Sequence, residues 1–116
     1  MRVVGDDATE KEFNEVEWSV GNRAPSVLIP IAHGSKEIEV VIVLDILSRA
    51  KANVIVASVE KTLEVLASRG VKIVADILIG DAQESSHDLI YLPGGTVGVQ
   101  RLSKSRLLKK LLKEQN

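Results

Sequence analysis

The sequence predicts an α/β domain built on a mainly parallel sheet, and three observations support this. Residues 27–32, 53–58 and 88–92 are short, continuous apolar runs bounded by turn residues, which is the pattern of strands buried on both faces. A longer apolar segment over 36–51 separates the first two runs, so strand, helix and strand are expected to form a right-handed βαβ unit. The 116 residues are enough for one buried core and too few for two ordinary domains.

The composition excludes several classes of protein. The chain is 45% hydrophobic and 27% charged, yet it has only one Phe, one Trp and one Tyr, too few for a nucleic-acid module that stacks bases on aromatic rings. It has no Cys, which removes disulfides, thiolate metal sites and cysteine nucleophiles together. No apolar run reaches the roughly 18 residues of a membrane span. We therefore expect no nucleic-acid or membrane partner, no metal or other cofactor, and a cytoplasmic location, with chloroplast or nucleus left open.

The first 25 residues are predicted to be a tail or an interdomain linker. Residues 1–24 hold six acidic and three basic side chains, and the stretch ends at Pro25. Within it, residues 13–18 alternate apolar and polar side chains, as an edge strand does. At the other end of the chain, residues 101–116 hold six basic side chains and one acidic one, which is typical of a helix with a solvated basic face.

A helix is predicted over 36–51, after a turn at His33-Gly34-Ser35. Ser35 is expected to cap this helix. Apolar residues cover most of the helix circumference, so we expect burial on two sides. One side would face the sheet, and the other would face a second subunit.

The remaining segments are shorter. Residues 63–66 and 71–74 are predicted to form a small hairpin around Ser68-Arg69-Gly70, whereas residues 76–81 are ambiguous. A final helix is predicted over 104–115, with leucines on one face. The sequence ends directly after this helix, where a βα array would continue with a strand. We therefore expect the chain to be the N-terminal part of a larger domain, with an incomplete sheet.

Candidate chemistry lies at the carboxyl ends of the strands, where doubly wound sheets bind their ligands. Gly94 and Gly95 follow the run at 88–92, and their backbone N–H groups are suited to hold an oxyanion; a plain tight turn is the alternative. Glu39 stands in the first turn of the predicted helix between apolar neighbours, which makes it a candidate acid or base. The alternative is that Glu39, like Glu37, only complements the helix dipole.

Two other polar groups are interpreted structurally. Ser85-Ser86-His87-Asp88 contains the residue types of a catalytic triad, but neighbours in sequence cannot converge on one carbonyl, so a loop is expected. His33 has no second His, Cys or paired carboxylate at metal-ligand spacing, so it is expected to be hydrogen-bonded rather than metal-bound.

Four stretches read together resemble the DJ-1/PfpI family, within the class I glutamine amidotransferase-like fold. The matching stretches are 27–39, 45–65, 67–76 and 88–102. Residues 13–18 and 103–115 further resemble plant proteins with two DJ-1 units in tandem, at the start of the second unit. The resemblance implies a flavodoxin-like three-layer sandwich, of which residues 26–116 are the N-terminal part.

In that family a cysteine beyond the last helix attacks the substrate, a glutamate in the first helix is its acid/base partner, and a diglycine helps to form the oxyanion site. The resemblance assigns these two latter roles to Glu39 and to Gly94 with Gly95, and it places Ser68 and Arg69 near the site and a dimer interface. It implies a small aldehyde substrate, with glyoxalase III conversion of methylglyoxal to lactate, deglycation, and protection against oxidative stress. Family members are usually homodimers.

Two hypotheses remain open. In the first, the chain is part of a glyoxalase III- or deglycase-like enzyme whose nucleophile lies beyond Asn116, so the chain is inactive alone. In the second, it is a degenerate repeat that serves as a dimerisation or interdomain scaffold through helix 36–51. An independent flavodoxin-like ligand binder is disfavoured, because the sequence has no phosphate loop.

Overall fold

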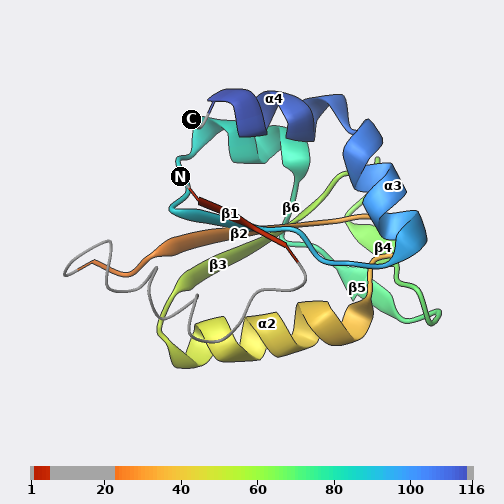
Figure 1. Cartoon of the computed structure of the whole chain (residues 1–116), viewed down its shortest axis with the longest axis horizontal. Coiled ribbons are helices and arrows are strands. Elements are labelled where there is room, and N and C mark those ends of the chain that lie inside the picture. The colour runs from red at the N-terminus through yellow and green to blue at the C-terminus, as the bar shows by residue number, and fades with distance from the viewer. Residues whose placement is uncertain (1, 6–22, 115–116) are drawn as a thin grey trace.

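The computed structural model describes residues 2–5 and 23–114, which form three layers with a parallel sheet in the middle (Figure 1). The sheet has the strand order β1-β7-β2-β3-β6. Its strands are β1 (Arg2–Val4), β2 (Ser26–Ile31), β3 (Asn53–Ser58), β6 (Ile77–Leu78) and β7 (Leu89–Tyr91). All four neighbouring pairs are parallel. The predicted α/β fold with a mainly parallel sheet is therefore confirmed.

Helices cover both faces of the sheet. Helix α2 (Glu37–Arg49) lies on one face. The 3-10 helix η1 (Ile79–Glu84), α3 (Thr96–Lys104) and α4 (Arg106–Glu114) lie on the other (Figure 1). A separate antiparallel hairpin of β4 (Glu64–Leu66) and β5 (Lys72–Val74) follows β3, as predicted.

Two apolar cores fill the space between the layers, because successive strand residues point to opposite faces of the sheet. The core under α2 contains Val27, Ile29, Ile31, Val40, Val43, Leu47 and Leu89. The core under α3 and α4 contains Leu28, Ala57, Ile79, Ile90, Leu102, Leu108 and Leu111. The central strand β2 contributes to both cores, so the continuous apolar run that predicted it has a physical reason.

Several local predictions need correction. Ser35 does not cap α2: its hydroxyl oxygen accepts a hydrogen bond from the Ala32 N–H, and Lys36 holds the cap position without a side-chain bond. Arg2–Val4, expected in an irregular tail, form a strand of the sheet. The strand-like stretch 13–18 lies outside the described residues.

The predicted final helix is confirmed as α4, but the sequence did not predict the helix before it, α3. The chain forms two helices, α3 and α4, which are separated at Ser105. The Ser105 hydroxyl oxygen accepts from the Leu108 N–H, so this residue caps α4 and separates it from α3. The ambiguous stretch 76–81 contains β6 and the start of η1.

Candidate functional site

The candidate site lies where the carboxyl ends of β2 and β7 meet the first turns of α2 and α3 (Figure 1). The turn after β2 and the turn after β7 are joined directly, because the Lys36 N–H donates to the Gly94 carbonyl oxygen over 3.0 Å. The sequence predicted that Glu39 and the diglycine lie at this edge of the sheet. In the structure, the first turn of α2, which holds Glu39, lies beside the diglycine turn.

A glycine is required at the second position of the diglycine by the backbone conformation and by the surroundings. Gly95 has a φ of +102°, and a Cβ atom there would collide with the Gly34 carbonyl oxygen. The carbonyls of Gly94 and Gly95 accept hydrogen bonds from Lys36 and Val99. No hydrogen bond among the described residues is donated by the N–H group of Gly94 or of Gly95. The loop is therefore a tight turn that keeps two backbone donors available.

Glu39 is held by a residue that the sequence did not single out. The Tyr91 hydroxyl, at the end of β7, donates to Glu39 Oε1 over 3.0 Å. Glu39 Oε2 is buried without a hydrogen bond among the described residues, and Lys36 Nζ is 3.9 Å from it. One carboxylate oxygen is thus fixed by a hydrogen bond, and the other has none among the described residues. The signal that could have found Tyr91 is its position as the sole Tyr in a buried strand, where its hydroxyl needs a partner.

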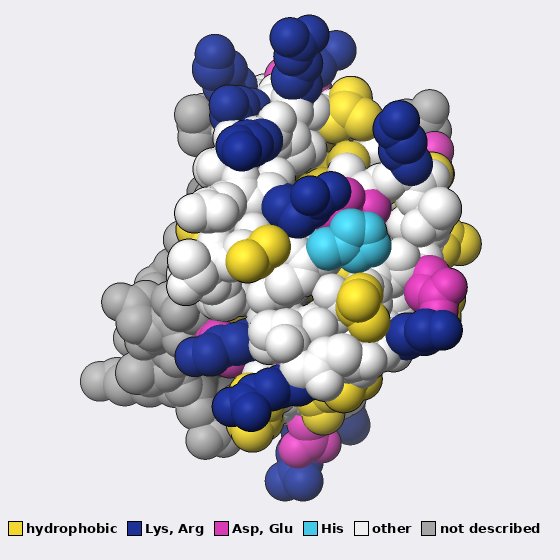
Figure 2. Space-filling view, turned by 90° about the vertical axis from the view of Figure 1, so that its right-hand side faces the viewer, with side chains coloured by type: hydrophobic (Ala, Val, Ile, Leu, Met, Phe, Trp, Pro, Cys, Tyr) yellow, Lys and Arg dark blue, Asp and Glu magenta, His cyan; other side chains and the backbone are white. Residues whose placement is uncertain are grey.

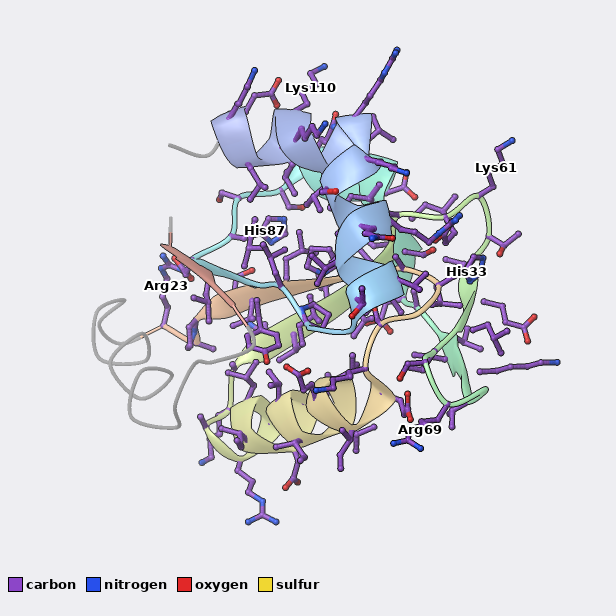
Figure 3. The ribbon with its side chains drawn as sticks, turned by 45° about the vertical axis from the view of Figure 1, so that its right-hand side comes forward. Arg23, His33, Lys61, Arg69, His87 and Lys110 are labelled. Carbon is purple, nitrogen blue, oxygen red and sulfur yellow. The ribbon has the colours of Figure 1, made fainter. Side chains whose placement is uncertain are left out.

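Glu37 faces a different neighbour. Its Oε2 atom accepts from the Ser68 hydroxyl over 3.0 Å and from the Arg69 N–H over 3.3 Å. The pKa of Glu37 lies below its ordinary value, mainly because its own backbone N–H donates to the carboxylate. The hydrogen bonds from Ser68 and Arg69 lower the pKa further, whereas desolvation acts in the opposite direction. Figure 3 shows Arg69 on the hairpin loop beside the start of α2. Glu37 therefore anchors the hairpin to α2 and is separate from the Glu39 site.

A third carboxylate, Glu60, forms a cluster that sequence reasoning missed. Its oxygens accept from the Arg101 guanidinium of α3, and Oε2 also accepts from the His33 backbone N–H over 2.9 Å. The hydrogen bonds from Arg101 hold the pKa of Glu60 below its ordinary value, against the opposing effect of burial. His33 Nε2 lies 3.9 Å from Glu60 Oε1. Figure 2 shows a histidine side chain at the surface beside basic and acidic side chains.

The two histidines are hydrogen-bonded. His33 Nδ1 accepts from the Leu66 N–H over 3.1 Å, which confirms its interpretation as a hydrogen-bonded residue. His87 Nε2 lies 3.2 Å from the Ala82 carbonyl oxygen, and Figure 3 shows the two histidines at opposite ends of the sheet. Within residues 2–5 and 23–114, no group of three His, Asp or Glu side chains is arranged to bind a metal.

The segment 85–88 is a loop, as expected. Asp88 pairs with Arg23 and accepts from the Ser26 N–H, so it does not contact His87 as a triad acid would. The hydrogen bonds from Arg23 lower the pKa of Asp88, with burial acting in the opposite direction. This group connects the start of β7 to the start of β2.

An apolar groove of about 410 Å³ lies next to the diglycine. It is lined by Gly5, Leu92, Pro93, Gly94, Val99, Leu102, Ser103, Leu108, Lys109 and Leu112. The groove therefore runs from the carboxyl end of β7 along α3 and α4.

None of the described helices has the length and apolar character needed to cross a bilayer.

The comparisons with known proteins agree with this architecture. Protein DJ-1 homolog B of Arabidopsis thaliana is 50% identical over 111 residues, which are 96% of this chain and 25% of that protein. The structure of oxidised Toxoplasma gondii DJ-1 matches with a TM-score of 0.76 and 47% identity, over 78% of this chain and 50% of that one. The glutathione-independent glyoxalase DJR-1.2 of Caenorhabditis elegans is 33% identical over 89 residues, 77% of this chain and 46% of that protein.

The chain thus spans a quarter of the plant relative and about half of the other two proteins. The sequence profile of the DJ-1/PfpI family matches residues 25–116, which include both the α2 turn with Glu39 and the diglycine turn. With the parallel sheet, the two turns and this match in agreement, the chain belongs to the DJ-1/PfpI family.

Proposed function

We propose that residues 26–116 supply the acid/base and oxyanion groups of a DJ-1/PfpI reaction centre for small aldehydes such as methylglyoxal, and that the chain is inactive alone. The observation that carries the proposal is the Glu39 carboxylate, tied to Tyr91 by one oxygen while the other is buried without a hydrogen bond. The glyoxalase name of the worm relative supports an aldehyde substrate. The chain itself has no Cys, so the nucleophile would have to come from outside these 116 residues.

The proposed chemistry assigns one task to each group. A thiolate adds to the aldehyde carbon, and the carbonyl electron pair moves to oxygen, where the Gly95 N–H stabilises the negative charge and a proton completes the hemithioacetal. Glu39 then carries a proton from the former aldehyde carbon to its neighbour through an enediol, which yields a lactoyl thioester. Water hydrolyses the thioester to lactate and restores the thiol. Deglycation would use the same addition to a carbonyl-derived adduct.

The first test is the activity of the chain itself. Purified residues 1–116 are expected to form no lactate from methylglyoxal above a heat-inactivated control, because an acid and two amide donors cannot replace the missing nucleophile. Lactate formation by the chain would contradict the proposed inactivity.

The second test requires the coding sequence downstream of codon 116. If an extended chain carries a Cys after a further strand, Glu39→Gln in that chain is expected to lower kcat by at least about 100-fold. Glu37→Gln is the matched control, since Glu37 stands in the same helical turn but binds the hairpin, and it should keep kcat within about threefold. Equal losses in both variants would show that Glu39 has only a structural role.

A second candidate function, a dimerisation or interdomain scaffold, is favoured by one surface. Ile38, Val41 and Ile42 of α2 are 62%, 60% and 50% exposed, whereas Val40 and Val43 of the same helix are buried. An apolar face of this kind is typical of an interaction surface. Ser or Asn in place of Cys in the downstream sequence, together with association through this face, would support the scaffold.

A further inference from the structure

The turn after β2 and the helix α3 meet through their backbones at the carboxyl end of the sheet (Figure 1). A Cβ atom at Gly98 would lie 2.6 Å from the Ser35 backbone nitrogen, and one at Gly95 would collide with the Gly34 carbonyl oxygen. An approach this close leaves no room for side chains that could fix the angle between the two segments. The orientation of α3 therefore depends on contacts to either side of Gly98.

Glu60 joins the same two segments at a second point. Its carboxylate accepts from the His33 backbone N–H, at the start of the turn, over 2.9 Å, and from the Arg101 guanidinium of α3. The Glu60 backbone N–H donates to Ser58 Oγ over 3.0 Å, and the side chain is mostly buried, so the carboxylate is held at the end of β3. Hydrogen bonds between a carboxylate and a guanidinium are among the strongest in proteins, so this link is a firm one.

The geometry of a helix makes the Glu60 link a control on the diglycine. Gly98 lies midway between Gly95 and Arg101 in the sequence, so the contact point stands about 4.5 Å from each of them along the helix axis. The Lys36 N–H bond to the Gly94 carbonyl oxygen holds the near end of α3, but a single bond permits rotation about itself. A tilt about Gly98 therefore moves Arg101 and the Gly95 N–H by similar distances in opposite directions.

A small tilt is large for an oxyanion donor. Over a lever arm of about 4.5 Å, a displacement of roughly 1 Å corresponds to a tilt of about 13°. A donor has to lie about 2.7–3.1 Å from the oxyanion, and a misplacement of about 1 Å can lower a rate by roughly 100-fold.

We propose that Glu60 is a positioning residue of the reaction centre: by joining the turn after β2 to Arg101, it sets the angle of α3 and so aims the Gly95 N–H at the substrate oxygen. The inference rests on the proposed function for the role of the diglycine. The orientation of α3 is measured without any activity, however, so a failure of the aldehyde chemistry and a failure of this positioning role are distinguishable.

The test measures the orientation of backbone N–H bonds in the 116-residue chain by NMR residual dipolar couplings, with β2 and β3 as the reference frame. Glu60→Gln removes the charge of the acceptor. Arg101→Gln removes the guanidinium and leaves the carboxylate that accepts from the His33 N–H. Both variants are expected to tilt α3 and the Gly95 N–H by about 10° or more relative to the sheet.

Asp88→Asn is the matched control. Asp88 also accepts from a guanidinium, that of Arg23, and from a backbone N–H, that of Ser26. It lies at the amino ends of β2 and β7, however, and so away from α3. This substitution should lower the urea midpoint, as the Glu60 and Arg101 variants do, but should leave the Gly95 N–H in its wild-type orientation.

Two results would overturn the proposal. A wild-type orientation of the Gly95 N–H in both Glu60→Gln and Arg101→Gln would mean that Glu60 only stabilises the fold. An equal tilt of α3 in Asp88→Asn would mean that the reorientation is a general result of lost stability. Should Glu60→Gln fail to fold, Arg101→Gln decides the question alone, because it keeps the bond between Glu60 and the turn.

Discussion

Three carboxylates connect segments that are far apart in the sequence. Glu37 joins α2 to the hairpin loop, Glu60 joins the end of β3 to α3, and Asp88 joins the start of β7 to the start of β2. In each of them hydrogen bonds hold the pKa below its ordinary value. Glu37 and Glu60 stabilise turns near the candidate site, whereas Asp88 lies at the opposite, amino ends of β2 and β7. Glu39 is the carboxylate with an unbonded oxygen in the site.

The ion pair of Glu60 and Arg101 is expected to stabilise the fold more than a surface pair does. Arg101→Gln should lower the free energy of unfolding by about 1–2 kcal/mol, because the Glu60 side chain is only 10% exposed and would lose its strongest donor. Arg49→Gln removes a solvent-exposed pair with Asp45 and should cost less than about 0.5 kcal/mol. Urea denaturation at pH 7 measures both, and equal costs would contradict the proposed difference.

Asp88 predicts how stability depends on pH. Its folded pKa lies below the ordinary value of 3.8, so its contribution is present at neutral pH and is lost as the pH falls through the folded pKa. Asp88→Asn should therefore cost about 1 kcal/mol at pH 7 and progressively less below about pH 4. Denaturant titrations from pH 7 to pH 2.5 test this. Asp45→Asn, at an exposed pair, is the control, and an Asp88→Asn cost that does not change with pH would refute the assignment.

At the scale of the elements, α3 begins against the turn after β2. A Cβ atom at Gly98 would lie 2.6 Å from the Ser35 backbone nitrogen, so the helix and the turn are in contact through the glycine. The close approach places the diglycine turn beside the first turn of α2, and the geometry of the candidate site depends on it.

Gly98→Ala separates this packing requirement from helix propensity. Propensity alone predicts a gain of up to about 1 kcal/mol for Ala in a helix, whereas the steric conflict with backbone atoms predicts a loss of roughly 2 kcal/mol. We expect the loss. Gly80→Ala is the control, because its Cβ would meet Leu107 Cδ1 at an ordinary 3.5 Å. Thermal unfolding of both variants decides the sign, and a raised midpoint for Gly98→Ala would contradict the close approach.

The elements that were predicted from the sequence are those with a local signal. β2, β3 and β7 are continuous apolar runs because their residues are buried on both faces. α3 was missed because Gly98 interrupts it and Gly98 and Leu102 are its buried residues, which leaves no apolar stripe to recognise. β1 was missed because a strand of only three residues has little signal of its own and forms by pairing with β7, about three quarters of the chain length away.

The same distinction applies to the site. Glu39 and the diglycine could be predicted from their places at a helix start and a strand end. The Tyr91–Glu39 bond could not, because it joins residues 52 positions apart, and the Glu60–Arg101 pair depends on how α3 packs on the end of β3. Pairings of this kind arise from tertiary structure, and no spacing in the sequence encodes them.

At the scale of the whole molecule, the exposed apolar face of α2 is expected to drive association. The wild-type chain should sediment as a dimer or larger species at micromolar concentration, because Ile38, Val41 and Ile42 present one continuous apolar surface. Val41→Glu combined with Ile42→Lys should give a monomer and change the free energy of unfolding by no more than about 0.5 kcal/mol. Val74→Lys, at a position on the hairpin that is 71% exposed, is the control and should leave association unchanged. A monodisperse wild-type monomer with a cooperative thermal transition would contradict this expectation.

The pairing of β1 with β7 has a consequence for the order in which the protein is made. The ribosome synthesises Arg2–Val4 before β2, β3 and β6, yet their partner Leu89–Tyr91 emerges only after all of these strands. During translation β2 and β3 can join across their short connection, while the leading residues remain without a neighbour. Of the five strands of this sheet, β1 is therefore synthesised before the others and is the last to find its partner, and a nascent chain arrested before β7 would leave β1 available to other polypeptides.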